Sequence, residues 1–205
     1  THKNVSINQI ICKIAREKDI DIIFLAEYDD NIQSLAGALD MQSYFTLGCD
    51  RIKVMGRIKS VEPGPQGTRY SIQIIDNKYI LCALHLPSQM SSGHQERRNI
   101  VIQTILNDLQ DIEKKLGSKR SILLGDFNED PYEDGCLSAV NFHGLPCLND
   151  ALKIYRKIEG RQFEMFYNPM WNLFGDFNSP PGTYYYAGSN PKCSYWHIFD
   201  QVMIR

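Results

Sequence analysis

Ile122-Leu-Leu-Gly-Asp-Phe-Asn-Glu129 is the stretch from which the fold of this chain can be inferred. A short apolar run, of a length typical of a buried strand, is followed by a glycine, a carboxylate and a carboxamide. Asp126 can bind a divalent cation or orient a water molecule. Asn128, two residues later, faces the same side of an extended backbone and can donate hydrogen bonds to an anion. The pair predicts metal-assisted attack on a phosphate at the end of this strand.

The composition is that of an ordinary globular protein. The chain has 205 residues, of which 43% are hydrophobic and 22% charged, with a formal net charge of -2 and a pI of about 6.2. We expect a single domain spanning residues 1–205. No apolar run approaches the eighteen or so residues that a transmembrane helix requires. The charge argues against a protein that coats nucleic acid by bulk electrostatics, but it leaves open a nuclease with a local basic groove.

The cysteines are scattered, without a CxxC pair or metal-ligand spacing. We expect buried free thiols in a reducing compartment, no zinc site, and a cytoplasmic location. The chain starts with Thr-His-Lys-Asn, without an initiating Met or a hydrophobic signal, so we expect the gene product to begin earlier. The six cysteines are Cys12, Cys49, Cys82, Cys136, Cys147 and Cys193.

Hydrophobic periodicity predicts alternating helices and strands. Helices are expected at residues 4–18, 29–39, about 91–115 (capped by Ser91 or Ser92) and 149–157. Strands are expected at residues 21–27, 43–47, 52–61, 69–75, 78–86, 121–125, 182–186 and 195–204. The intervening Pro63-Gly-Pro-Gln-Gly67 is typical of a turn. The pattern favours α/β layers on mixed sheets over a Rossmann fold, whose glycine fingerprint is absent.

Polar residues at or near the ends of three expected strands, and on a fourth strand late in the chain, occur in a fixed order, and the set resembles the endonuclease/exonuclease/phosphatase superfamily. Ile-Ile-Phe-Leu-Ala-Glu27 is similar to its apolar-Leu-Gln-Glu element, and Ala-Leu-His85-Leu to its Asn-Thr-His-Leu element. Leu-Leu-Gly-Asp126-Phe-Asn128 matches Gly-Asp-Phe-Asn, and Phe-Asp200-Gln-Val-Met-Ile is similar to the Ile-Asp-Tyr-Ile strand. The resemblance implies the DNase-I-like fold, a four-layer α/β sandwich in which two mixed β-sheets pack face to face between flanking helices.

Two motifs of the family are missing from residues 1–205. The family begins with a strand that ends in Asn, and it finishes with a Ser-Asp-His motif that carries the general-base histidine. His197 lies upstream of Asp200, on what is expected to be the same strand. The chain is either clipped at both ends or a degenerate member without catalysis. We expect clipping, because the remaining motifs are intact.

The resemblance implies a role for each matching residue. Glu27 would be a ligand of Mg²⁺ or Mn²⁺. Asp126 would orient or deprotonate the attacking water, and Asn128 would donate to the phosphate oxygens. His85 would hydrogen-bond a phosphate oxygen or protonate the leaving group. Asp200 would hold the histidine of the missing motif in its productive tautomer.

Three further residues are candidates for substrate contact. Arg97 and Arg98 follow His85 closely and are candidates to clamp a phosphate, although helix-surface charges are the commoner explanation. Trp196 is a candidate to stack a base, although most aromatic residues in such a segment pack in the core. The repeated letters Gly175-Asp-Phe-Asn178 are expected to be a loop, because no β-branched strand precedes them.

Together these features predict a Mg²⁺-dependent hydrolase that cleaves a phosphodiester or phosphomonoester by in-line attack of an activated water. Nucleic acid is the first candidate substrate. Phosphoinositides and sphingomyelin-type lipids are the alternatives, because the resemblance implies machinery that also serves them. The alternative of a different class is a catalytically inactive binding or scaffold module that retains the fold.

Overall fold

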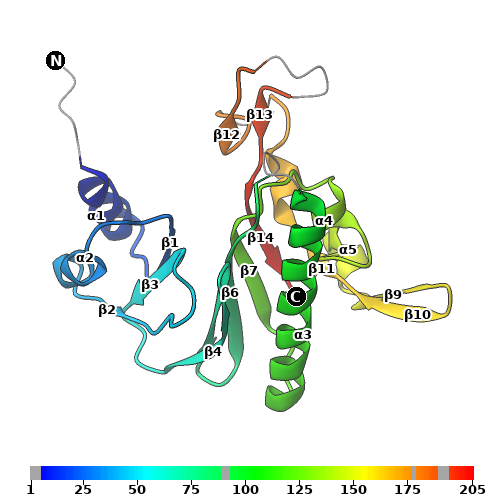
Figure 1. The fold of residues 1–205 in the computed structure, drawn as a ribbon, viewed down its shortest axis with the longest axis horizontal. Helices are drawn as coiled ribbons and strands as arrows, with labels where there is room; N and C mark the ends of the chain where they lie inside the picture. Colours follow the sequence, from blue (N-terminus) through cyan, green and yellow to red (C-terminus); the bar gives the residue numbers. More distant parts are fainter. Residues whose placement is uncertain (1–5, 89–92, 177–178, 189–193) are drawn as a thin grey trace.

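The computed structural model describes residues 6–88, 93–176, 179–188 and 194–205. Its helices and sheets form four layers (Figure 1). Helices α1 (Ile7–Glu17) and α2 (Ile32–Ala38) cover a three-stranded sheet, which packs on a seven-stranded sheet. Helix α3 (His94–Leu116) covers the opposite face of the larger sheet. The predicted α/β class and its layers are therefore confirmed.

The two sheets differ in how their strands run. The three-stranded sheet is antiparallel throughout, and its strand order is β1 (Ile22–Ala26), β3 (Ile52–Gly56), β2 (Gln42–Ser43). The larger sheet is mixed, since β6 and β7 pair in parallel, as do β8 and β11. Its order is β4 (Val61–Gly67), β5 (Tyr70–Ile75), β6 (Tyr79–His85), β7 (Ser121–Asp126), β14 (Asp200–Ile204), β11 (Phe166–Tyr167), β8 (Gly144–Leu145).

Strand β3 shows how the sequence produces the layers. Successive side chains of a strand point to opposite faces. Ile52 and Val54 therefore pack between the sheets against Ala83 of β6, whereas Met55 packs under α1 and α2. Helix α3 closes the other side with an apolar stripe at helical spacing, which includes the fully buried Ile105.

Residues 63–67 belong to a strand, so their prediction as a turn was wrong. This strand is β4, the edge strand of the larger sheet, and its register against β5 shifts between Pro63 and Gln66. Proline cannot donate to a ladder but is tolerated on edge strands and at bulges. The preceding strand, expected at 52–61, ends at Gly56.

Two predictions near the C-terminus also need correction. The helix expected at 149–157 is the short α5 (Leu148–Ala151), followed by the hairpin of β9 (Tyr155–Ile158) and β10 (Arg161–Glu164). The strand expected at 195–204 is divided into β13 (Trp196–His197) and β14, so His197 and Asp200 lie on different strands. The remaining short elements are α4 (Asp134–Leu137), a 3-10 helix (Pro169–Leu173) and β12 (Tyr184–Tyr185).

The cysteines of the described residues are free, with three buried, one partly buried and Cys147 exposed. Cys193 lies outside the described residues. The predicted caps Ser91 and Ser92 also lie outside them, and α3 has Gly93 at its N-cap without a side-chain hydrogen bond. Within the described ranges, no helix is both long enough and apolar enough to cross a membrane.

Candidate active site

Four of the predicted site residues lie at strand ends on one edge of the two sheets. His85 ends β6 and Asp126 ends β7, and the parallel register places them side by side. Asp200 begins the antiparallel strand β14 opposite Asp126. Glu27 follows β1 of the smaller sheet in a left-handed conformation (φ 52°), with its backbone N–H donating to the Arg51 carbonyl at 3.0 Å. Residues far apart in the sequence therefore meet at a single location.

His85 is the centre of this group. Its Nε2 atom lies 3.8 Å from Glu27 Oε1 and 3.6 Å from Asp126 Oδ2. The ring is buried, and its Nδ1 atom has no hydrogen-bond partner among the described residues. Burial lowers the pKa of His85, and Glu27 opposes this shift while Arg51 and Arg69 add to it. The imidazole is therefore neutral at pH 7.

The charges around His85 predict how its pKa responds to substitution. In a proton NMR titration of the metal-free protein, we expect a His85 midpoint below the ordinary value of 6.5. Arg69→Met should raise that midpoint, because a positive neighbour is removed, and Glu27→Gln should lower it, because an anion is removed. Arg161→Met, an exposed change on β10, serves as the control and should leave it unchanged. A midpoint above 6.5 in the wild type would contradict this assignment.

Asp126 is held in place by the residue two positions later. The Asn128 backbone N–H donates to Asp126 Oδ1 at 2.8 Å, and its Nδ2 donates to Asp126 Oδ2 at 2.9 Å and to the Leu86 carbonyl at 3.0 Å. Burial raises the pKa of Asp126 to about 6; the hydrogen bonds from Asn128 lower it, whereas Asp200 and Glu27 raise it further. A carboxylate with this pKa can accept a proton near neutral pH.

Gly125 explains why a glycine precedes the aspartate. Its φ is +136°, and an added Cβ would lie 2.1 Å from the carbonyl oxygen of Leu84 on the neighbouring strand. Only a residue without a side chain allows β7 to approach β6 so closely here. The glycine therefore determines where Asp126 emerges from the sheet.

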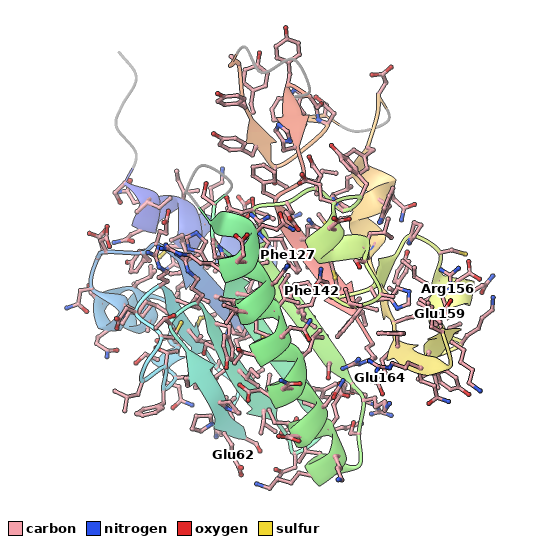
Figure 2. The ribbon with its side chains drawn as sticks, turned by 45° about the vertical axis from the view of Figure 1, so that its right-hand side comes forward. Glu62, Phe127, Phe142, Arg156, Glu159 and Glu164 are labelled. Atoms are coloured by element: carbon pink, nitrogen blue, oxygen red, sulfur yellow. The ribbon has the colours of Figure 1, made fainter. Side chains whose placement is uncertain are left out.

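The loop after Asp126 is anchored in the core. Phe127 is fully buried and packs edge-to-face on Phe142, with ring centroids 5.5 Å apart, in the cluster under α3 (Figure 2). Its backbone N–H donates to the Phe199 carbonyl at 2.7 Å. The phenylalanine between the two polar residues thus holds the loop while its neighbours face the site.

The structure corrects the prediction for Arg98. Its side chain is 1% exposed, and it forms an ion pair with Glu129, which is 3% exposed. The guanidinium also donates to the Pro87 carbonyl at 2.7 Å. Arg98 is therefore engaged inside the protein and offers no exposed face to a substrate phosphate.

Two guanidinium groups lie beside Glu27 and His85, and sequence reasoning missed both of them. Arg51 Nη1 is 3.7 Å from Glu27 Oε1, and Arg69 donates to the His85 carbonyl at 3.4 Å. Burial lowers the pKa of Arg69, and the positive charges of Arg51 and Arg97 lower it further, so Arg97 adds to the positive charge of this region. Only Arg97 was predicted from the sequence. A signal was available, because a residue before a strand lies at the same edge as the residue after its antiparallel partner.

The other predicted residues flank this centre. Asp200 is exposed, and its backbone N–H donates to Thr183 Oγ1 at 3.0 Å. Trp196 is partly exposed on β13, and its ring lies 5.1 Å from that of Tyr185. In the repeated Gly-Asp-Phe-Asn string, Gly175 and Asp176 lie in an irregular loop, as expected, and Phe177 and Asn178 are outside the described residues.

The donor atoms fit a hard cation that keeps most of its water. Within the described part of the chain, no group of three or more His, Cys, Asp or Glu side chains is arranged to hold a metal ion. Mg²⁺ is commonly bound by one or two carboxylates together with water and substrate phosphate. Glu27 is exposed, and its charge and that of Asp200 raise the pKa of Asp126, so a bound cation would relieve this repulsion.

The fold is shared with solved phosphate-processing proteins, although no protein-family model and no curated protein sequence matches the chain. Truncated TDP2 from Caenorhabditis elegans is 16% identical, with a TM-score of 0.56 over 96% of this chain and 75% of that one. The 3' phosphatase NExo from Neisseria, bound to product DNA hairpin, is 13% identical, with a TM-score of 0.53 over 95% and 80%. An endonuclease/exonuclease/phosphatase family protein from Bacteroides thetaiotaomicron is 11% identical, with a TM-score of 0.55 over 96% and 72%. The chain therefore has the DNase-I-like fold of the endonuclease/exonuclease/phosphatase superfamily, as its ordered motifs predicted.

Proposed function

We propose that this protein is a metal-dependent hydrolase of phosphate esters, which cleaves a phosphodiester or phosphomonoester by in-line attack of water. The observation that carries the proposal is the Asp126 carboxylate. It is partly buried, with its side chain 29% exposed, it has a pKa of about 6, and it is aligned by two hydrogen bonds from Asn128 at a distance of 3.6 Å from His85. A base with these properties suits proton abstraction from water near neutral pH.

Each residue has a defined part in the reaction. Asp126 takes a proton from the attacking water as the water oxygen bonds to phosphorus and the ester P–O bond breaks. The leaving oxygen keeps the electron pair of that bond and takes a proton from solvent water, and Asp126 later returns its own proton to solvent. Asn128 orients Asp126, because both of its amide hydrogens are already donated to Asp126 and Leu86. A hydrogen bond from Asn128 to phosphate requires one of these to be released.

The lowered pKa of His85 distinguishes between its two predicted roles. A neutral imidazole is a poor general acid for a leaving group but can donate one hydrogen bond to a phosphate oxygen. Its Nε2 atom lies between the carboxylates of Glu27 and Asp126, where the reacting phosphate would be placed. We therefore assign His85 to phosphate binding.

Glu27 is the proposed ligand of Mg²⁺ or Mn²⁺. When bound, the cation supplies charge stabilisation to the phosphate oxygens. The guanidinium groups of Arg51, Arg69 and Arg97 add positive charge around the carboxylates, so an anionic substrate is attracted despite the net charge of -2. Nucleic acid is the first candidate substrate, and the bound DNA of the similar NExo structure supports it.

The proposal predicts that hydrolysis requires a divalent cation and that Glu27 sets the concentration needed. Full-length protein is assayed on plasmid, abasic duplex, single strand, phosphoinositide, sphingomyelin and a generic diester, each with Mg²⁺ and with EDTA. We expect EDTA to abolish turnover. Glu27→Gln should raise the Mg²⁺ concentration for half-maximal rate by about tenfold or more, because a hard cation loses an anionic ligand.

The matched control is Glu62→Gln, an exposed glutamate on the edge strand β4 (Figure 2). It should leave both the rate and the Mg²⁺ dependence unchanged. Absence of metal-dependent hydrolysis across all the substrates would overturn the proposal and favour the binding or scaffold module. An equal response of the two glutamate variants would overturn the role of Glu27.

A further inference from the structure

The hairpin of β12 and β13 exposes aromatic rings that the proposed chemistry does not use. Tyr185 and Tyr195 are 52% and 66% exposed, and their rings stack with centroids 6.1 Å apart at 17°. The Trp196 ring contacts the Tyr185 ring, with centroids 5.1 Å apart and an interplanar angle of 59°. Tyr184 is 46% exposed. We call these four residues the aromatic platform. The exposure of its three tyrosines distinguishes it from core packing.

The aromatic platform is continuous with the candidate active site. The hairpin rises from the end of the larger sheet at which β14 begins (Figure 1). Thr183, just before β12, accepts hydrogen bonds through Oγ1 from the backbone N–H groups of Phe199 and Asp200, at 3.1 and 3.0 Å. The Tyr184 ring stacks on that of Phe199, with centroids 5.3 Å apart. Tyr184 of the platform therefore contacts the residue that precedes Asp200, and Asp200 pairs with Asp126 across the sheet.

The buried carboxylate of Asp130 ties the hairpin to the loop that carries Asp126 and Asn128. Asp130 is 2% exposed, and its Oδ2 lies 2.7 Å from His197 Nδ1. Its Oδ1 accepts a hydrogen bond from the backbone N–H of Ile198 at 2.8 Å. The base of the hairpin is thus fixed to the site before any substrate arrives. Pre-organisation of this kind lowers the entropic cost of binding.

We propose that the aromatic platform stacks unpaired nucleobases next to the phosphate being hydrolysed, so that the substrate is single-stranded nucleic acid or a frayed strand end. This inference rests on the proposed function and names its substrate class. A single strand presents alternating charged phosphates and flat bases, and the protein offers arginines around the carboxylates and stacked rings beside them. A duplex hides its base faces, so it matches these rings poorly.

Equilibrium binding tests the inference independently of catalysis. Fluorescence anisotropy of the full-length protein in EDTA is measured with a labelled oligothymidylate, with an abasic oligomer of equal phosphate number, and with the corresponding duplex. We expect the oligothymidylate to bind most tightly. Tyr185→Ala and Tyr195→Ala should each weaken it by about tenfold, the range of one stacked base, and leave the weaker abasic binding unchanged.

Two variants keep the test specific. Tyr185→Phe retains the ring and should bind the oligothymidylate like the wild type. Tyr155→Ala removes a tyrosine of similar exposure (47%) from β9 and should also bind like the wild type. Circular dichroism melts establish that every variant is folded.

Several results would overturn the inference. The first is equal affinity of the alanine variants and the wild type for the oligothymidylate. The second is an abasic oligomer or duplex that binds as tightly as the oligothymidylate. The third is a loss of binding to phosphatidylcholine–phosphatidylserine vesicles in the alanine variants without any loss of oligonucleotide binding. Hydrolysis of bis(p-nitrophenyl) phosphate with Mg²⁺ is measured separately. Absent hydrolysis with intact, ring-dependent binding would refute the proposed function and leave the platform standing, whereas hydrolysis with ring-independent binding would refute the platform alone.

Discussion

Replacing Asp126 by asparagine is expected to lower the turnover number for phosphate ester hydrolysis by a factor on the order of 10² to 10⁴, the usual contribution of a general base. The amide cannot accept the proton of the attacking water at neutral pH, although it occupies nearly the same volume. Single-substrate kinetics with saturating Mg²⁺ measure the change. The matched control is Asp176→Asn, which lies in the repeated Gly-Asp-Phe-Asn string but in an exposed loop, and it should keep wild-type turnover.

The same substitution is expected to change how the stability of the metal-free protein depends on pH. The pKa of Asp126 rises from 3.8 to about 6 on folding, so the folded state favours the protonated carboxyl. The unfavourable contribution is absent below about pH 4, grows as the pH rises toward 6, and is complete above that value. Asparagine removes this penalty but also loses one of the two hydrogen bonds that Asn128 donates to the carboxylate. Between pH 4 and pH 8 in EDTA, the free energy of unfolding of Asp126→Asn should therefore rise relative to that of the wild type by on the order of 1–2 kcal/mol.

Urea denaturation of the wild type and of Asp126→Asn from pH 4 to pH 8 tests this prediction. The free energy of unfolding of Asp126→Asn, relative to that of the wild type, should increase with pH and level off above about pH 6. A relative stability of the variant that does not rise between pH 4 and pH 8, or a variant that retains wild-type turnover, would contradict the assignment of Asp126 as a partly buried base.

Arg98→Met is expected to destabilise the fold by about 3–5 kcal/mol, because it leaves the Glu129 carboxylate buried without its cationic partner. Glu129 is 3% exposed, and burial already raises its pKa against the opposing effect of Arg98. Arg97→Met, one position earlier, removes an exposed guanidinium and should change stability by less than about 0.5 kcal/mol. Urea denaturation at pH 8 compares the two variants directly.

The variants of Arg97 and Arg98 should also differ in how they affect substrate binding. Arg97→Met should weaken binding of an anionic substrate, because Arg97 adds to the positive charge around Arg69. The double variant Arg98→Met/Glu129→Gln should recover part of the stability lost by Arg98→Met, since no buried charge remains. If Arg98→Met costs no more stability than Arg97→Met, the buried ion pair does not have the role assigned to it here.

Local sequence was a good guide where one face of an element had to be buried. The apolar runs before Glu27, His85 and Asp126 predicted strands that the structure contains, and the helical stripe of α3 identified the layer that covers them. It was a poor guide where long-range pairing overrides propensity. Pro63 and Pro65 are typical of turns, but pairing with β5 makes their segment an edge strand.

The hairpin at 155–164 shows a second limit. Residues 149–157 contain enough apolar positions to suggest a helix, but the chain turns instead at Glu159 and Gly160, both of which have positive φ. Gly160 adopts that conformation without steric cost, and the strands then pair antiparallel. Periodicity over so short a segment does not distinguish a helix from a hairpin.

The sequence by itself determined the class of fold and the order of the strand-end residues, since burial of an apolar run and the end of a strand depend on neighbouring residues. Its resemblance to the superfamily singled out Glu27, His85, Asp126 and Asn128 as the candidate set. Only the tertiary structure decided which of two adjacent arginines faces the interior. Successive helix residues point about 100° apart, and the packing partner alone selects between them.

The tertiary structure alone also placed Arg51 beside Glu27, Arg69 beside His85 and Asp130 beside His197. These contacts link residues distant in the chain, through sheet register and the path of a hairpin. The motif that starts at Ile122 identified the loop of the candidate active site. The charges around it, its pKa values and the aromatic surface beside it depend on which strands lie next to one another, and that is a property of the folded chain.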